Sequence, residues 1–248
     1  MIELSRVEVT FHRGTVLETR ALRGIDLVIP RGQFVSVIGS NGAGKSTLLN
    51  VLAGTVRVTA GRIVVDGMDV TPLTAAARAR LLARVFQDPL AGTCAELMIE
   101  ENLALAEARG RGRGLALAVA GAGRARWRER LAALGLGLED RLGDRMGLLS
   151  GGQRQAIALL MATMAPSRIL LLDEHTAALD PGTAAFVLGL TTRLVAELRL
   201  TTLMVTHSMQ QALSHGDRLL MLHEGRIVLD VVGEAKARLG VEALLAEF

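Results

Sequence analysis

Short apolar runs of strand length alternate with helical patterns in the first part of the chain. Strand patterns cover Leu4–Phe11, Gly24–Ile29, Gln33–Gly39 and Arg62–Val65. The segment KSTLLNVLAG from Lys45 has a helical pattern that ends at Gly54. Alternating strands and helices predict an α/β fold with a mostly parallel sheet.

The pattern changes in the middle of the chain. DGMDV at Asp66–Val70 is typical of a turn, and Thr74–Ala83 has a helical composition. VFQDP at Val85–Pro89 is expected to form a short strand that is stopped by proline. From about Pro89 to Leu149, β-branched residues are few and Ala, Leu, Glu and Arg are frequent, which indicates a helical region.

Strand patterns return after Gly152, with helical segments between them. They cover Ile169–Asp173, Thr201–Thr206, Arg218–Leu222 and Arg226–Asp230. An α/β sheet interrupted by a helical insertion is the simplest organisation. We therefore expect one domain over residues 1–248, with residues 1–88 and 156–248 as the catalytic α/β core and about 89–155 as a helical subdomain.

Composition narrows the class of protein. Half of the 248 residues are apolar, which is enough for a substantial core, and a formal charge of +3 with 2% aromatic residues gives little support for nucleic-acid binding. Cys94 is the single cysteine and is expected to be a small buried residue. We see no signal peptide and no run of about 18 uncharged apolar residues that could span a bilayer. We therefore expect a cytosolic chain.

The segment Arg109–Arg130 is rich in glycine and arginine, and it has two interpretations. It is either a solvated turn and helix face, or a basic surface that contacts acidic phospholipid headgroups. Trp127, the only tryptophan, either anchors at such a membrane surface or covers the core of the helical region itself.

The nonapeptide GSNGAGKST fits the phosphate-binding pattern G-x-x-x-x-G-K-[ST] through Gly39, Gly44, Lys45 and Ser46. Glycines let the chain turn tightly and point backbone N–H groups inward, and the following helix N-terminus favours an anion. Of the 28 Lys and Arg residues only Lys45 and Lys236 are lysines. A lysine in the loop of an otherwise arginine-rich chain indicates that this position requires a compact cation. The alternative is a structural turn. The candidate nucleotide loop comprises Gly39, Ser40, Asn41, Gly42, Ala43, Gly44, Lys45, Ser46 and Thr47.

ILLLDEH at Ile169–His175 places two acids after a strand expected to be buried on both faces. Ligands bind at the carboxyl ends of strands in open α/β sheets. Next to a phosphate loop, Asp173 is expected to hold Mg²⁺ through its water shell, while Glu174 accepts a proton from the attacking water. The alternative is that both acids merely end the strand at the surface.

LSGGQRQA at Leu149–Ala156 predicts a second helix terminus that can bind an anion. Ser150 is a good N-cap, and Gly151 and Gly152 leave backbone N–H groups bare before Gln153. One nucleotide does not need two anion-binding motifs from the same chain. The presence of both motifs would be explained if two subunits bind the same phosphate, each through a different motif.

In this order, the motifs resemble those of the nucleotide-binding subunit of ABC transporters over essentially the whole chain. Gln87 then matches the Q-loop, which contacts Mg²⁺ and the transporter interface, and Ser150–Gln153 match the signature motif. Asp180 in AALD matches the D-loop, and His207 matches the switch histidine that senses the γ-phosphate. Phe11 lies where the family places the aromatic residue that stacks on adenine.

The resemblance implies an ABC-type P-loop NTPase: a mostly parallel core sheet, an antiparallel N-terminal β-subdomain and a helical insertion. It also implies ATP and Mg²⁺ as ligands, a head-to-tail dimer around two ATP molecules, and peripheral attachment to the cytoplasmic face of the inner membrane through permease subunits. DEHTAALDP, VFQDPLAGT and EENLAL resemble a branch of bacterial importers for amino acids, which also use a solute-binding protein. His175 departs from the proline of many members, and we expect no effect on hydrolysis.

Three other classes have to be weighed on the sequence alone. ABC-type ATPases that act on DNA or ribosomes usually have tandem domains or long coiled-coil insertions, which this chain lacks. An exporter, or a membrane ATPase that transports nothing, would carry the same hydrolytic motifs. A non-hydrolysing binding module conflicts with Glu174 and His207. The solute and the choice between homodimer and heterodimer are not encoded in these motifs.

Overall fold

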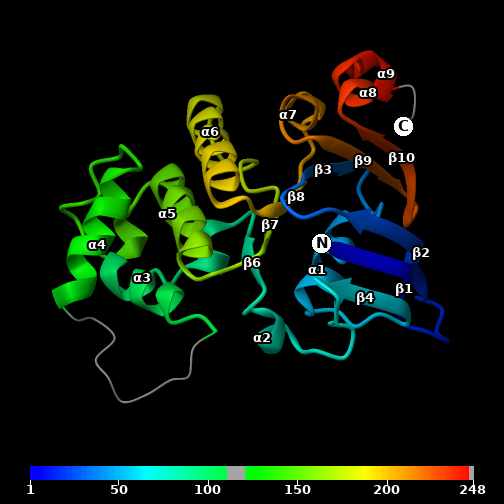
Figure 1. Ribbon diagram of the computed structural model, residues 1–248, viewed down its shortest axis with the longest axis horizontal. Coiled ribbons are helices and arrows are strands. Elements are labelled where there is room, and N and C mark those ends of the chain that lie inside the picture. Colours follow the sequence, from blue (N-terminus) through cyan, green and yellow to red (C-terminus); the bar gives the residue numbers. More distant parts are fainter. Residues whose placement is uncertain (111–120, 246–248) are drawn as a thin grey trace.

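The computed structural model describes residues 1–110 and 121–245, and a six-stranded sheet forms its centre (Figure 1). The strand order is β10-β9-β3-β8-β7-β6, in which all neighbours are parallel except the edge pair β9 and β10. Its strands are β3 (Phe34–Gly39), β6 (Leu82–Val85), β7 (Ile169–Asp173), β8 (Thr201–Val205), β9 (Arg218–His223) and β10 (Arg226–Val232). Every residue of β3 and β8 is buried, as expected for central parallel strands.

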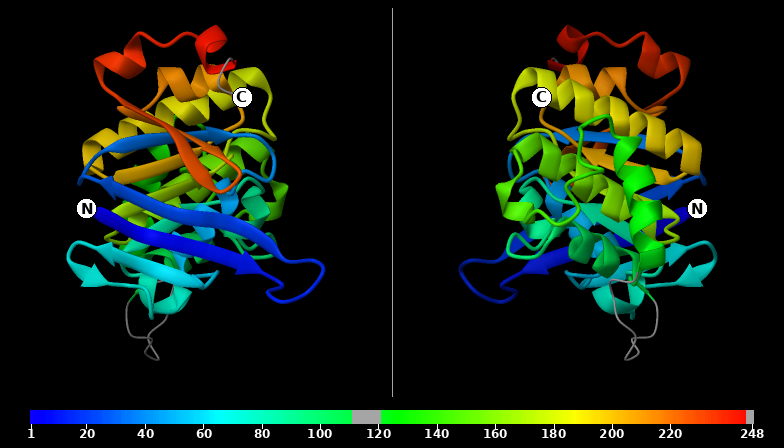
Figure 2. Two further views of the ribbon diagram at one scale, coloured as in Figure 1. Left: turned by 90° about the vertical axis from the view of Figure 1, so that its right-hand side faces the viewer. Right: turned by 90° about the vertical axis from the view of Figure 1, so that its left-hand side faces the viewer.

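A second, antiparallel sheet is built from the N-terminal part of the chain in the order β2-β1-β4-β5. Its strands are β1 (Ile2–Phe11), β2 (Thr19–Ile29), β4 (Ala60–Val65) and β5 (Met68–Asp69). The left view of Figure 2 shows β1, β2 and β4 side by side. Apolar residues of this sheet, of α1 (Lys45–Ala53) and of the parallel sheet form one continuous core. This arrangement agrees with the mostly parallel core sheet and the antiparallel N-terminal β-subdomain expected from the sequence.

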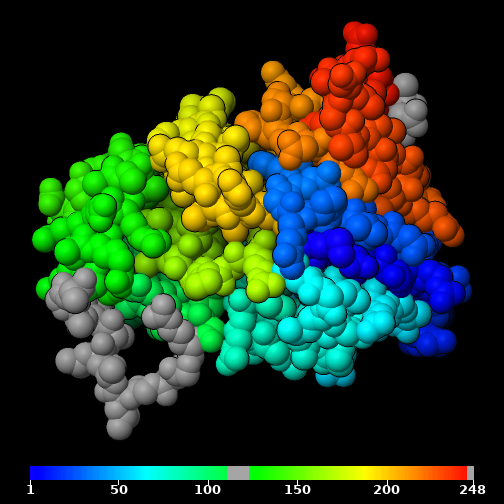
Figure 3. Space-filling model, viewed as in Figure 1, coloured from blue at the N-terminus to red at the C-terminus, as the bar shows by residue number. Residues whose placement is uncertain are grey.

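A group of helices lies toward the other end of the molecule, away from the antiparallel sheet. They are α3 (Ile99–Glu107), α4 (Gly121–Ala132), α5 (Gly151–Met164) and α6 (Pro181–Leu198). Their apolar side chains join those of β6 and β7 in a second core, and Figure 3 shows α6 between the helical and the β-rich ends. The remaining helices are short: α2 (Ala75–Arg78), α7 (Met209–Ser214), α8 (Glu234–Ala237), α9 (Val241–Leu245) and the 3-10 turns Pro89–Gly92 and Met146–Leu148. No helix in the two described ranges is long and apolar enough to cross a bilayer.

In the described part of the basic segment, Trp127 is buried in the helical end while the arginines of α4 lie on the surface. Trp127 is 2% exposed and its Nε1 donates to Glu107, so it packs in the core of the helical region. Arg124 and Arg126 of the same helix pair with Glu100 and Glu107. The part of the predicted basic segment at residues 111–120 lies outside the described residues.

Three local expectations were wrong. The strand expected at Val85–Pro89 lies earlier, at Leu82–Val85, and the helix expected over Thr74–Ala83 covers Ala75–Arg78. Leu82 pairs with Ile169 across the parallel sheet, and this pairing outweighs the helical propensity of the segment. Cys94 is exposed, because it lies in the irregular stretch before α3.

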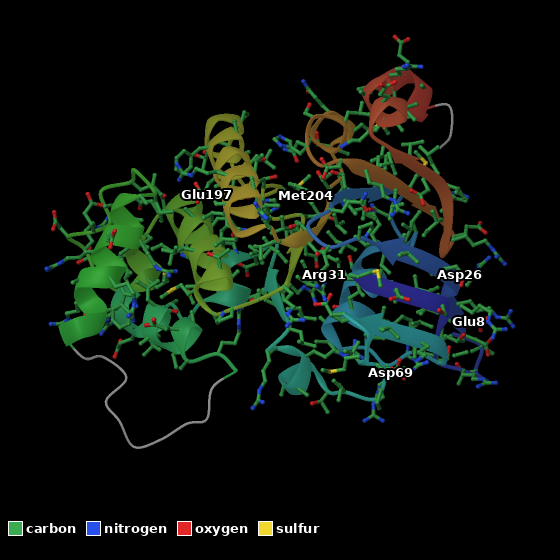
Figure 4. The ribbon with its side chains drawn as sticks, in the orientation of Figure 1. Glu8, Asp26, Arg31, Asp69, Glu197 and Met204 are labelled. Carbon is green, nitrogen blue, oxygen red and sulfur yellow. The ribbon has the colours of Figure 1, made fainter. Side chains whose placement is uncertain are left out.

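Asp66 joins several segments at the junction of the two sheets. Its carboxylate lies 2.6 Å from the Met1 amine, 2.6 Å from Nε of Arg31 and 2.6 Å from Nη1 of Arg168. Figure 4 labels Arg31 at this junction. The Asp66 side chain is 5% exposed, so the contacts link β1, the turns after β2 and β4, and the start of β7 through one buried carboxylate.

Candidate functional site

The loop between β3 and α1 needs glycine at both of its ends. Gly39 has φ 150° and Gly44 has φ 103°. A Cβ atom on Gly39 would lie 2.2 Å from the carbonyl oxygen of Leu222, and one on Gly44 would lie 2.6 Å from that of Ala21. Both the backbone conformation and the close approach of neighbouring chain therefore exclude a side chain.

Lys45 begins α1 and folds back over the loop. Its Nζ donates to the carbonyl oxygens of Gly39 at 2.7 Å and Ser40 at 2.9 Å. Burial lowers the pKa of Lys45, while the nearby charges of Glu174 and Asp173 oppose this shift. Because Gly44 caps α1 without a side chain, the first N–H groups of the helix are free of side-chain capping. The loop thus presents backbone donors and one buried cation.

A cavity of about 320 Å³ opens beside this loop. It combines the loop with residues from β1, from β2 and from the ends of β7 and β8. Its lining comprises Phe11, Thr19, Ala21, Asn41, Gly42, Ala43, Gly44, Lys45, Ser46, Thr47, Glu174 and His207. The structure therefore brings Phe11, most of the loop, Glu174 and His207 together around one cavity.

Glu174 and His207 face each other across the ends of β7 and β8. The distance from Oε1 of Glu174 to Nε2 of His207 is 2.6 Å. Glu174 has a φ of 46°, and its backbone N–H donates to the carbonyl oxygen of Val205 at 3.0 Å. A non-glycine residue in this left-handed region is held there by its surroundings, as is frequent at functional sites.

The lining of this cavity leaves out Asp173 and Gln87, and also Gly39 and Ser40 of the loop. Asp173 ends β7, and its Oδ2 accepts from Nη2 of Arg84 at 2.5 Å. Gln87 is exposed just after β6. The sequence reading missed Arg84, although a charged residue within the apolar run LARVF was a visible signal.

The second anion-binding motif is also placed away from this cavity. Ser150 caps α5, with its Oγ accepting from the Gln153 N–H at 3.2 Å, while the Gln153 side chain accepts from the Ser150 N–H. Asp180 caps α6 through the N–H of Thr183 at 3.0 Å. None of the described residues that line the loop cavity comes from Ser150–Gln153 or is Asp180.

His175 follows the two acids and is 2% exposed. Its Nε2 lies 3.0 Å from Oγ1 of Thr191 on α6, whose hydroxyl donates to the carbonyl oxygen of Val187. Thr191 therefore accepts from His175, which assigns the proton to Nε2. Burial, with the nearby charge of His215, lowers the pKa of His175 to about 4, so the ring is neutral near pH 7.

Comparison with known proteins shows the family of the chain. A family model described as ABC transporter matches residues 22–177. A tyrosine transport ATP-binding protein from Clostridioides difficile is 41% identical over 248 residues, which are 100% of this chain and 98% of the relative. A methionine import ATP-binding protein, MetN, from Vibrio cholerae is 33% identical over 92% of this chain and 64% of the relative. An aliphatic sulfonates import ATP-binding protein from Paraburkholderia xenovorans is 37% identical over 86% of this chain and 56% of the relative.

Solved structures show the same likeness. A dimeric ATP-binding cassette in a post-hydrolysis state with ADP and Pi is 30% identical, with a TM-score of 0.79 over 94% of this chain and 98% of that one. A cassette in an ADP conformation has a TM-score of 0.82 over 100% of this chain and 97% of that one, and at 24% identity it supports the fold alone. The chain belongs to the ABC transporter family, as an ATP-binding and ATP-hydrolysing subunit.

Proposed function

We propose that this subunit powers the import of amino acids or similar small solutes by hydrolysing ATP in the cavity beside the Gly39–Thr47 loop. The observation that carries the proposal is the contact of 2.6 Å between Glu174 and His207 at the mouth of a glycine-rich phosphate loop. A base and a polar sensor in contact at this place suit the activation of a water molecule next to a terminal phosphate.

The lining residues divide into binding and catalytic roles in this proposal. Phe11, which is 36% exposed at the end of β1, offers a face on which adenine stacks. The backbone N–H groups of the loop and Lys45 bind the phosphates. Glu174 accepts the proton of the attacking water, and His207 contacts both Glu174 and the terminal phosphate.

The residues present fit Mg²⁺ as a companion of ATP. In the described ranges, no three His, Cys, Asp or Glu side chains gather into a metal cluster, but Mg²⁺ commonly takes one or two carboxylates plus phosphate oxygens and water. Ser46 supplies a hydroxyl, Asp173 a carboxylate and Gln87 an amide oxygen, all of them hard ligands. When bound, the ion neutralises charge on the phosphates.

A head-to-tail dimer accounts for the separation of the two anion-binding motifs. The Ser150–Gln153 terminus and Asp180 do not line the loop cavity of their own chain, so in the proposal they close on the nucleotide of a second copy. A related cassette was captured as a dimer with ADP and Pi, which supports this arrangement.

A groove between the helical end and the β-rich body suits the permease. Its volume is about 740 Å³, and it is lined by the chain before and after Gln87, including Phe86, Pro89 and Cys94, together with α3 and α5. A permease segment seated there would move with the helical end and thereby receive the motion driven by ATP. The subunit is then peripheral, on the cytoplasmic face of the inner membrane.

The proposed class of transported solute is inferred from the related proteins. Tyrosine and methionine transport proteins are among them, as are sulfonate importers, so amino acids or similar small solutes are the proposed cargo. Importers of this kind work with an extracytoplasmic solute-binding protein, which we propose as a further partner.

The test uses a tagged Glu174→Gln variant. We expect ATP hydrolysis to fall by about 10²–10⁴-fold while ATP binding is retained, because the carboxamide cannot accept the proton. Normal hydrolysis by this variant would refute the assignment of the base. Lys45→Ala is the matched comparison and should lose nucleotide binding; unchanged affinity would count against the phosphate loop.

Gentle extraction of membranes with the same variant in MgATP identifies its partners. A multi-spanning permease together with a solute-binding protein would establish an importer. A membrane protein without a solute-binding protein would favour an exporter or a non-transport membrane complex. Recovery of a soluble dimer alone would contradict a transporter role.

A further inference from the structure

We propose that Arg84 is a positioning residue that fixes the carboxylate of Asp173 for the metal and connects it to the helix after the phosphate loop. The inference rests on the proposed role of Asp173 in holding Mg²⁺. Arg84 lies on β6, and its Nη2 donates to Oδ2 of Asp173 at 2.5 Å while its Nη1 donates to Oδ1 of Asn50 at 2.7 Å. One guanidinium thus joins β6, β7 and α1.

The pair is shielded from solvent. The side chains of Arg84 and Asp173 are 13% and 15% exposed, so their attraction is screened far less than that of a surface ion pair. Arg84 also stacks on the ring of Phe86, with its Cζ 4.8 Å from the ring centroid. Its Nε has no hydrogen-bond partner within the described part of the chain, so the two Nη contacts and the ring set the orientation.

The planar guanidinium group of arginine suits simultaneous donation to Asp173 and Asn50. A guanidinium reaches two acceptors on different elements at once, whereas a lysine ammonium presents a single point charge. Arg84 holds Oδ2 of Asp173 and so fixes the direction of Oδ1. A fixed outer contact of this kind typically accounts for about 10–100-fold in metal affinity. A lysine at this position would preserve the charge but not the orientation of the carboxylate.

The same residue borders the groove proposed for the permease. Arg84 and Phe86 both line the groove, and the backbone carbonyl of Phe86 accepts from Nε2 of Gln155 on α5 at 3.1 Å. A shift of the helical end would therefore act on β6 close to Arg84 and change the orientation of Asp173. Arg84 thus connects the groove directly to the carboxylate of Asp173.

The test measures metal binding directly. Binding of a fluorescent ADP analogue is titrated with Mg²⁺, and the same analogue is titrated in EDTA, for Arg84→Lys, Arg84→Met and wild type. We expect both variants to need roughly tenfold more Mg²⁺ for half-saturation, with affinity in EDTA within about twofold of wild type. Arg80→Met, an exposed arginine that lines the same groove, is the matched control and should behave as wild type.

The alternative is that Arg84 only supplies positive charge. In that case Arg84→Lys would bind Mg²⁺ as wild type does, Arg84→Met would bind it more tightly, and the proposal would be overturned. If both Arg84 variants fail to fold, Asn50→Ala carries the test: loss of the second anchor should raise the Mg²⁺ requirement about threefold or more, and an unchanged requirement would overturn the proposal. Failure of wild type to bind the analogue in EDTA and in Mg²⁺ would instead refute the proposed nucleotide site.

Discussion

At the scale of single residues, the buried carboxylate of Asp66 contributes to the stability of the folded chain. Burial alone would raise the pKa of Asp66, but hydrogen bonds from the Met1 amine, Arg168 and Arg31 outweigh it and hold the pKa well below its usual value. A depressed folded-state pKa gives stability that is fully present above the unfolded value, which is about 4, and is lost as the pH falls below it.

Replacement of Asp66 by Asn should therefore lower the free energy of unfolding by about 2 kcal/mol at pH 7. The free energy of unfolding of the variant should also fall less steeply below about pH 4, because Asn has no proton to gain. Urea unfolding at pH 7 and at acidic pH measures both effects. Asp69→Asn is the matched control and should cost less, since the Asp69 carboxylate is 36% exposed and pairs with Arg62. Figure 4 labels Asp69. Equal losses for the two variants would contradict the role of Asp66.

The sequence identified Glu174 from the two acids that follow an apolar strand, and His207 from its match to the switch histidine of the family. Their contact follows from the fold, because parallel strands end at the same edge of a sheet. The pair of Arg84 and Asp173 is different, since 89 positions separate its members and their meeting depends on the register between β6 and β7. The sequence interpretation placed this strand three residues too late, so it could not foresee the pair.

At the scale of elements, the approach of α5 to α6 depends on Gly152. A Cβ atom on Gly152 would lie 2.1 Å from Cγ2 of Thr183, in the first turn of α6. Gly151 and Gly152 were expected to expose N–H groups to a phosphate. The structure adds a packing role for Gly152, because α6, which begins at Pro181 after the N-cap Asp180, fills the space beside the signature motif.

Gly152→Ala should lower stability by about 1–3 kcal/mol, since overpacking forces the two helices apart. Thr183→Ser removes Cγ2 and keeps the hydroxyl, so the double variant should regain most of the lost stability. Thermal unfolding of the two single variants and the double variant measures this rescue. An additive loss without rescue would show that the contact with Thr183 is not the cause.

The elements themselves were largely foreseeable where burial is continuous. The expected strands at Gln33–Gly39 and Ile169–Asp173 agree with β3 and β7 to within one residue, because unbroken apolar runs leave few other choices. The two-residue strand β5 lies inside the expected turn Asp66–Val70, and it forms only because β4 lies beside it. Pairing between distant segments decides such short elements, and local composition does not encode it.

At the scale of the whole molecule, two cores meet at the parallel sheet. The first joins the antiparallel sheet, α1 and one face of the parallel sheet, and the second joins the other face with the helical end. The nucleotide cavity lies beside the first core, and the groove of about 740 Å³ lies beside the second. Relative motion of the two ends would therefore change the groove while each core stays packed.

Cys94 offers a direct test of where the permease docks, because it is exposed and lines this groove. In the isolated subunit we expect Cys94 to react readily with a fluorescent maleimide. In the assembled transporter labelling should be roughly tenfold slower or more, because a docked partner excludes solvent from the centre of its interface. Mass spectrometry of the labelled chain over time measures both rates.

The control places the thiol at a surface position outside the groove. In a Cys94→Ser background, Glu197→Cys places a thiol at an exposed position of α6, which Figure 4 labels. Glu197 is not among the residues that line the groove. Its labelling should be the same with and without the permease. If the thiol on α6 were protected while Cys94 still reacted freely, the permease would dock on α6. The motion of the helical end would then have to reach it by a route that bypasses the groove and Arg84.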